Sequence, residues 1–113
     1  MQLGKFRIDA VETGVLYLDG GAMFGVVPKA LWSKLYNPGD ELNRIPLSVR
    51  PLLIQYDDRT ILIDTGNGTK MSEKLIKIYG VDIEKSSIAI ALQKFNLAPD
   101  DITMLTEYLS GLN

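Results

Sequence analysis

Hydrophobic and polar residues alternate along the first half of the chain, whereas in the second half apolar residues recur at helical spacing. Residues 6–12 alternate loosely between apolar and charged side chains, and a short apolar run follows at 15–18. Because successive side chains of a strand point to opposite faces, this pattern predicts β-strands. The turn-forming residues 19–21 interrupt the run, and the apolar stretch 22–27 stops at Pro28. Together these segments predict a β-hairpin.

A second strand pair is predicted between residues 48 and 64. Residues 48–56 form one predicted arm, 57–59 the turn and 60–64 the other arm. Pro51 has no N–H to donate, so its end of the arm is expected at a sheet edge or a bulge. The unbroken apolar run at 61–63 predicts a strand that is buried on both faces.

Helical spacing marks three further segments. Residues 29–36 predict a short helix, and Ser72 and Gly80 are suited to begin and end a second one. Serines at 86 and 87 precede a third segment whose apolar stripe is Ile88, Ala91, Leu92 and Phe95. Strands first and helices afterwards predict an α+β fold, in which a mixed β-sheet carries helices on one face. We take residues 1–113 as a single domain.

The composition removes most catalytic chemistry, because the 113 residues include no cysteine and no histidine. A disulfide framework, a cysteine nucleophile, a zinc site with Cys or His ligands and a Ser-His-Asp triad are therefore excluded. The net charge is −2, without the basic excess of a nucleic-acid-binding protein. No apolar run reaches the ~18 residues that span a membrane. The first residues lack the apolar middle of a signal peptide, so we expect a cytoplasmic protein.

Four segments in order carry a family resemblance. They are residues 19–28 (DGGAMFGVVP), 62–66 (LIDTG), 97–102 (LAPDDI) and 111–113 (GLN). Together they resemble the N-terminal portion of metallo-β-lactamase-fold hydrolases, especially the lactonase-like branch. The resemblance implies half of an αββα sandwich, and a parent that hydrolyses lactones or esters with zinc or another divalent metal.

The metal-binding motif of that family is missing where the resemblance implies it. Members continue with His-x-His-x-Asp-His, whereas here Thr106 is followed by Glu-Tyr-Leu-Ser and then by Gly111. The remaining carboxylates, hydroxyls and amides suit Ca²⁺ or Mg²⁺ better than zinc. We therefore expect this chain to hold no catalytic metal, to need no cofactor of its own, and to have no catalytic residue.

Three residues are the candidate site residues. The resemblance implies that Asp64 lies beside the metal centre and orients ligands and loops there. Its alternative role is to accept hydrogen bonds from the backbone of its own turn, residues 65–68. Met23 and Phe24 are implied to lie near the substrate mouth, and the alternative for both is packing against the core.

Three functions remain open at this point. The first is a truncated or internally deleted hydrolase, inactive unless a separate chain completes its site. The second is a binding or assembly module that forms homo-oligomers through exposed apolar surface, or through the edge strand near Leu105. The candidates for that surface, or for the core beside it, are Leu52, Ile54, Ile61, Ile63, Ile88, Leu92 and Phe95. The third is a carboxylate enzyme without metal, which no residue spacing favours.

Overall fold

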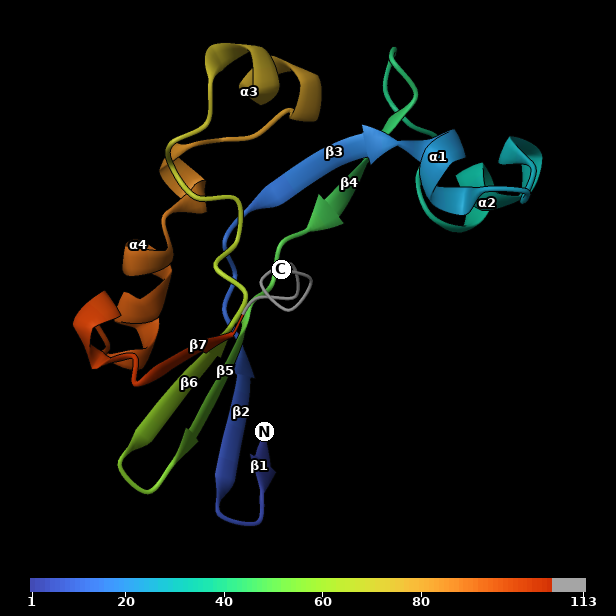
Figure 1. The fold of residues 1–113 in the computed structure, drawn as a ribbon. Helices are drawn as coiled ribbons and strands as arrows, with labels where there is room; N and C mark the ends of the chain where they lie inside the picture. Colours follow the sequence, from blue (N-terminus) through green and yellow to red (C-terminus); the bar gives the residue numbers. More distant parts are fainter. Residues whose placement is uncertain (107–113) are drawn as a thin grey trace.

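A computed structural model describes residues 1–106 and shows a mixed five-stranded sheet with a smaller two-stranded sheet beside it (Figure 1). The larger sheet has the order β1-β2-β5-β6-β7, in which only β6 and β7 are parallel. Its strands are β1 (Gln2–Leu3), β2 (Phe6–Ala10), β5 (Leu52–Tyr56), β6 (Arg59–Ile63) and β7 (Met104–Thr106). The predicted α+β class with a mixed sheet is confirmed.

The first predicted hairpin is half wrong. β3 (Val15–Asp19) is a strand, but the next residues form the helix α1 (Gly20–Phe24) rather than a second arm. The Asp19 carboxylate accepts a hydrogen bond from the Ala22 N–H at 2.7 Å, which caps this helix. Gly20 lies against the Trp32 ring, where an added Cβ would approach a ring carbon to 2.5 Å. Helix α2 (Lys29–Leu35), which carries Trp32, is present as predicted.

The true partner of β3 is β4 (Arg44–Ser48), a strand that the sequence pattern does not reveal. A central proline such as Pro46 is unfavourable in the interior of a sheet because it has no N–H to donate. Among the described strands β4 pairs with β3 alone, so it is an edge strand, which tolerates proline. The predicted arm 48–56 is therefore too long. β5 begins only after Pro51, whose carbonyl accepts the Val11 N–H at 2.8 Å.

The two α-helices of the second half begin at predicted serines, and the first of them also ends at the predicted glycine. In α3 (Glu73–Tyr79), Ser72 accepts the Leu75 N–H and Gly80 ends the helix in the left-handed conformation. Ser87 caps α4 (Ile88–Leu92), and Asn96 is left-handed at the exit of the short 3₁₀ helix η2 (Gln93–Phe95). Two further 3₁₀ helices are η1 (Glu84–Ser86) and η3 (Pro99–Asp101). None of the helices in residues 1–106 is both long and apolar enough to cross a membrane.

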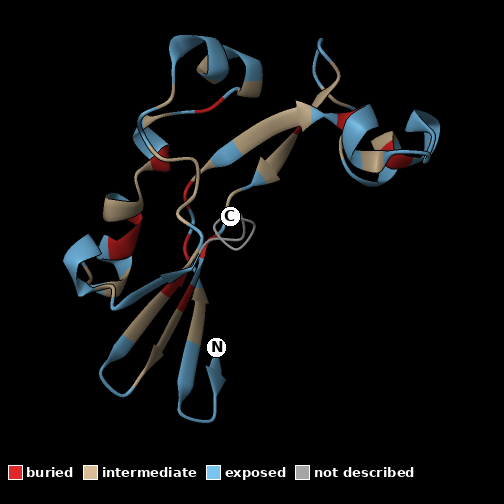
Figure 2. Ribbon diagram, in the orientation of Figure 1, coloured by how far each residue is buried: buried red, intermediate tan, exposed pale blue. Residues whose placement is uncertain are grey.

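The main core lies between the sheet and α4 (Figure 2). Leu53 of β5 and Leu62 of β6 face each other in register and pack with Val11, Ala91 and Leu92. Ile88 and Phe95 pack against this cluster, so these two and Leu92 belong to the covered side of the sheet. A second buried site lies at Trp32, which is 3% exposed.

The opposite side of the sheet is apolar and open. Strand alternation directs the neighbours of Leu53 and Leu62 away from α4. We call this surface the open sheet face; its residues are Ile8, Leu52, Ile54, Ile61 and Ile63. Leu52 is 41% exposed and the four isoleucines are half-buried, so the prediction that β6 is buried on both faces is wrong within the described chain.

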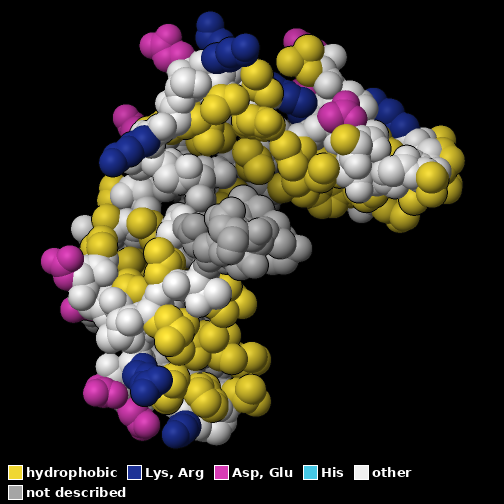
Figure 3. Space-filling model, in the orientation of Figure 1, with side chains coloured by type: hydrophobic (Ala, Val, Ile, Leu, Met, Phe, Trp, Pro, Cys, Tyr) yellow, Lys and Arg dark blue, Asp and Glu magenta, His cyan; other side chains and the backbone are white. Residues whose placement is uncertain are grey.

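The overall shape is a hollowed arch rather than a sphere. The larger sheet forms one limb, and β3 and β4 with α1 and α2 form the other (Figure 1). The radius of gyration is 16.5 Å, whereas a compact domain of this length would have about 13 Å. Hydrophobic side chains gather along the inner side of the arch (Figure 3).

Candidate functional site

The turn that follows β6 contains Asp64, the predicted site carboxylate. Asp64 has a φ of 73°, and its N–H donates to the Thr106 carbonyl at 2.7 Å, which ties the turn to β7. Its Oδ1 accepts the N–H groups of Thr65 at 2.6 Å and Gly66 at 3.3 Å. The carboxylate therefore bonds to the backbone of its own turn, the alternative that the sequence left open. Its role beside a metal centre stays a prediction.

A close contact holds this turn against the segment that follows β2. Gly66 has a φ of 74°, and a Cβ at this position would lie 2.6 Å from the Thr13 Oγ1. Thr13 is fully buried, and its hydroxyl donates to the Val49 carbonyl at 3.0 Å. Gly66 is thus required both by its backbone conformation and by the approach of Thr13. Thr13 was not predicted, because its partners are distant in sequence.

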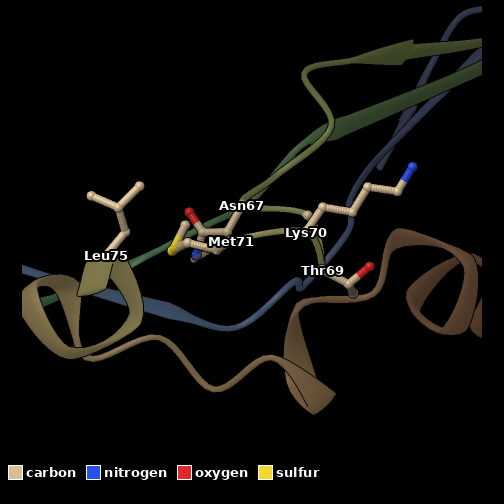
Figure 4. A pocket seen from close by; sticks show the side chains of 6 residues that line it. Asn67, Thr69, Lys70, Met71 and Leu75 are labelled. Atoms are coloured by element: carbon tan, nitrogen blue, oxygen red, sulfur yellow. The ribbon is translucent and has the colours of Figure 1, made fainter. Parts of the chain in front are cut away.

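The loop that links β6 to α3 lines an open pocket of about 460 Å³ (Figure 4). Asn67, Met71 and Leu75 line one part of it, and the Asn67 Nδ2 is buried without a partner in residues 1–106. Residues 66–70 precede α3 but lack the full Gly-x-x-x-x-Gly-Lys-Ser/Thr spacing of a phosphate loop. The Lys70 side chain extends away from Asn67 and Met71, and the loop serves as the connection from β6 to α3.

Met23 and Phe24 point into different surroundings. Phe24 stacks on Trp32 with ring centroids 5.0 Å apart and meets Tyr36 edge-on at 6.0 Å. Met23 is 47% exposed and lines a pocket of about 450 Å³ with Tyr17, among others. Both lie on α1, in the limb of the arch formed by β3, β4, α1 and α2 (Figure 1). This limb lies away from the turn after β6, so the structure does not bring Met23 and Phe24 together with Asp64. A substrate-mouth role remains a prediction for both.

Arg44 joins the two-stranded sheet of β3 and β4 to α3, and sequence reasoning missed it. Its guanidinium donates to the carbonyls of Lys77 and Ile78 at 2.8 and 2.9 Å, which satisfies the C-terminal end of the helix. Its Nε also binds the Asp40 Oδ2 at 2.9 Å. The backbone N–H of Arg44 bonds to Asp40 as well and, with the guanidinium, lowers the pKa of that carboxyl. The four-residue spacing from Asp40 was the available signal.

The metal-ligating side chains of residues 1–106 are dispersed. In the part of the chain that the structure describes, no three His, Cys, Asp or Glu side chains come close enough to hold a metal ion. The most suggestive carboxylate, Asp64, already accepts two backbone N–H groups. The segment implied to replace the histidine motif, residues 107–110, lies outside the described residues, as does the tail at 111–113.

Comparisons with known proteins identify the fold. No protein-family model and no curated protein sequence matches the chain. Among solved structures, a probable metal-dependent hydrolase from Staphylococcus aureus is 44% identical with a TM-score of 0.85. The match covers 95% of this chain and 38% of the hydrolase.

Two more distant structures share the fold. AidC, a dizinc quorum-quenching lactonase, is 19% identical with a TM-score of 0.67. AbOPH, a hydrolase of the β-lactamase superfamily, is 19% identical with a TM-score of 0.66. Each match covers 95% of this chain and 34% of the solved one. The chain therefore has the metallo-β-lactamase fold over the part that it shares with these structures, and it spans little more than a third of the length of the solved chains that it matches.

Proposed function

We propose that this chain is the scaffold portion of a metal-dependent hydrolase of lactones or esters, and that it is inactive by itself. The observation that carries the proposal is its 44% identity, over 95% of its length, to a probable metal-dependent hydrolase. In this role the chain contributes the five-stranded sheet and the turn at Asp64, whose position is held by Gly66 against Thr13. The proposal places the hydrolase in the cytoplasm.

The inactivity of the isolated chain follows from its donor groups. Zinc catalysis needs several ligands that converge on one ion and leave a position open for water. Histidine and cysteine are absent from the whole sequence. The ligands must therefore come from polypeptide other than these 113 residues.

Hydrolysis assays with the purified chain test the proposal. We expect no turnover of lactones, esters, phosphoesters or β-lactams above background with added Zn²⁺, and no stoichiometric zinc binding by isothermal titration. The Staphylococcus aureus hydrolase assayed in parallel is the control that the conditions support metal-dependent turnover. Turnover by the isolated chain, or tight binding of one or two zinc ions, would contradict the assignment of the ligands to other polypeptide.

A further inference from the structure

We infer that Asn67 is a site of spontaneous deamidation, where loss of the side-chain amide leaves an aspartyl or isoaspartyl residue. Asn67 and Gly68 are adjacent in the loop that links β6 to α3. The reaction requires water alone, and it is independent of the proposed hydrolase function. Two groups must react, the side-chain amide of Asn67 and the backbone N–H of Gly68, and neither is restrained by a hydrogen bond within residues 1–106.

The reaction proceeds in two balanced steps. The backbone nitrogen of Gly68 attacks the side-chain carbonyl carbon of Asn67, and the new carbon–nitrogen bond closes a succinimide ring. The bond from that carbon to Nδ2 breaks, and the amide nitrogen leaves as ammonia with the proton that solvent carries over from the Gly68 N–H. Water then adds to one ring carbonyl, breaks its bond to the ring nitrogen and returns a proton to that nitrogen. The backbone is restored when water attacks the side-chain carbonyl, and it becomes isoaspartyl when water attacks the main-chain carbonyl.

The amide of Asn67 is not held in place. Its Nδ2 is buried without a hydrogen-bond partner in residues 1–106. A buried donor that lacks a partner is energetically unfavourable, so no hydrogen bond is lost when the amide turns toward Gly68. Asn67 also lines the open pocket of about 460 Å³, through which water reaches the loop (Figure 4).

Gly68 presents an unobstructed nucleophile. No atom lies within 4 Å of the position of an added Cβ, and its φ of 73° is accessible to glycine at no steric cost. Within the described chain no hydrogen bond involves residues 67–71, so the N–H of Gly68 has no acceptor there. The loop can therefore adopt the conformation in which this nitrogen reaches the amide carbon.

The other asparagines in residues 1–106 lack this combination. Asn37 precedes a proline, which has no N–H to react. After Asn43, the next backbone N–H donates to the Asp40 Oδ1 at 2.9 Å. After Asn96, the next N–H donates to the Leu92 carbonyl at 3.2 Å. Only at Asn67 does the described chain leave the attacking nitrogen both present and free of a hydrogen bond.

Deamidation changes the charge and the backbone of this loop. A carboxylate replaces a neutral amide, so the net charge of −2 becomes more negative by one. The isoaspartyl form also adds a methylene group to the backbone between Gly66 and α3. Because Gly66 is held against Thr13, the turn at Asp64 keeps its place while the connection to α3 is altered.

The test follows the purified chain at neutral pH and body temperature by tryptic peptide mapping with mass spectrometry. Cleavage after Arg59 and Lys70 releases residues 60–70 as one peptide. We expect conversion of an amide to a carboxylic acid at position 67, with an isoaspartyl fraction. Incubation in ¹⁸O-labelled water, followed by digestion in ordinary water, should place one heavy oxygen there. Loss of Asn67 should be about tenfold or more faster than loss of Asn43 or Asn96.

Two variants and an unfolded sample serve as controls. Asn67→Gln lengthens the side chain and disfavours ring closure, so conversion at this position should stop. Gly68→Ala places a methyl group beside the attacking nitrogen and should slow conversion about tenfold or more. Circular dichroism shows whether each variant is folded. In guanidinium chloride, the original chain gives the rate without structure, and the folded chain should reach within about tenfold of it at Asn67.

Several results would overturn the inference. One is an Asn67 that stays intact in the folded chain while the unfolded chain is converted there. Another is equally fast loss of Asn43 or Asn96 in the folded chain. A third is conversion without any isoaspartyl product, or at an unchanged rate in Gly68→Ala, since either result excludes ring closure through the Gly68 nitrogen.

Discussion

Replacement of Gly66 by alanine tests how the turn at Asp64 is held. The new methyl group would meet two costs. The φ of 74° is a left-handed conformation that costs an L-residue about 1–2 kcal/mol. The Cβ would also lie 2.6 Å from the Thr13 Oγ1 and 3.2 Å from the Thr13 Cβ. Because Thr13 is buried and hydrogen-bonded, relief of this overlap costs about a further 1–3 kcal/mol.

Gly68 in the same loop provides a matched control. Its φ is 73°, but no atom lies within 4 Å of the position of an added Cβ. Gly68→Ala therefore incurs only the conformational cost, and the difference between the two variants measures the contact with Thr13. We expect the free energy of unfolding to fall by about 3 kcal/mol for Gly66→Ala and by about 1–2 kcal/mol for Gly68→Ala.

The assay is urea unfolding followed by far-ultraviolet circular dichroism, with each variant also made in a Thr13→Ala background. That background removes the hydroxyl that Gly66→Ala would strike, so the difference between the two alanine variants should shrink there. Equal losses for Gly66→Ala and Gly68→Ala in the original sequence would refute the close contact. The turn would then be held by the Asp64 hydrogen bonds alone.

Three further predictions concern the limb of the arch that contains β3, β4, α1 and α2. Arg44→Met should lower the free energy of unfolding by about 2 kcal/mol, since it removes two charged hydrogen bonds to α3. In the same urea assay, the control Arg50→Met breaks an exposed ion pair and should cost under about 1 kcal/mol, and equal losses would contradict the role of Arg44 in holding α3. Because the pKa of Asp40 is lowered in the native state, the stability that its carboxylate contributes is present above pH ~4 and lost as pH falls through the folded pKa. Asp40→Asn should therefore reduce the dependence of the free energy of unfolding on pH between pH 5 and about 2, and an unchanged dependence would contradict this role of Asp40. Phe24→Ala should shift the fluorescence of the single tryptophan to the red by exposing its ring, while Met23→Ala should leave it unchanged; identical spectra contradict the stacking.

Local signals were sufficient where an element is specified by its own residues. α3 begins after Ser72 and ends at Gly80 because a side-chain cap and a left-handed glycine act within one turn of the helix. The hairpin of β5 and β6 turns at 57 and 58, where Asp57 tolerates a φ of 49°. These features depend on neighbours in sequence, so the sequence predicts them correctly.

Local signals failed where a distant contact decides the conformation. Residues 22–24 have an extended pattern, yet they are helical, and the packing of the neighbouring Gly20 against the ring of Trp32 on α2 adds a tertiary contact to the local cap by Asp19. β4 has a proline at its centre, and its extended conformation is held by antiparallel pairing with β3, which is distant in sequence. In both segments tertiary packing overrides the local preference, which amounts to under about 1 kcal/mol per ordinary residue.

For the site, the sequence by itself determined which chemistry the chain lacks. The absence of histidine and cysteine is a property of composition, and no fold can supply those ligands from within the 113 residues. The turn at Asp64 was also identifiable from sequence. Only the tertiary structure decided that its carboxylate bonds to its own backbone and that Thr13 holds the turn. The tertiary structure also placed Leu92 in the core and four other candidates on the uncovered side of the sheet, namely Leu52, Ile54, Ile61 and Ile63. Hydrophobicity alone does not show which side of a sheet a helix covers.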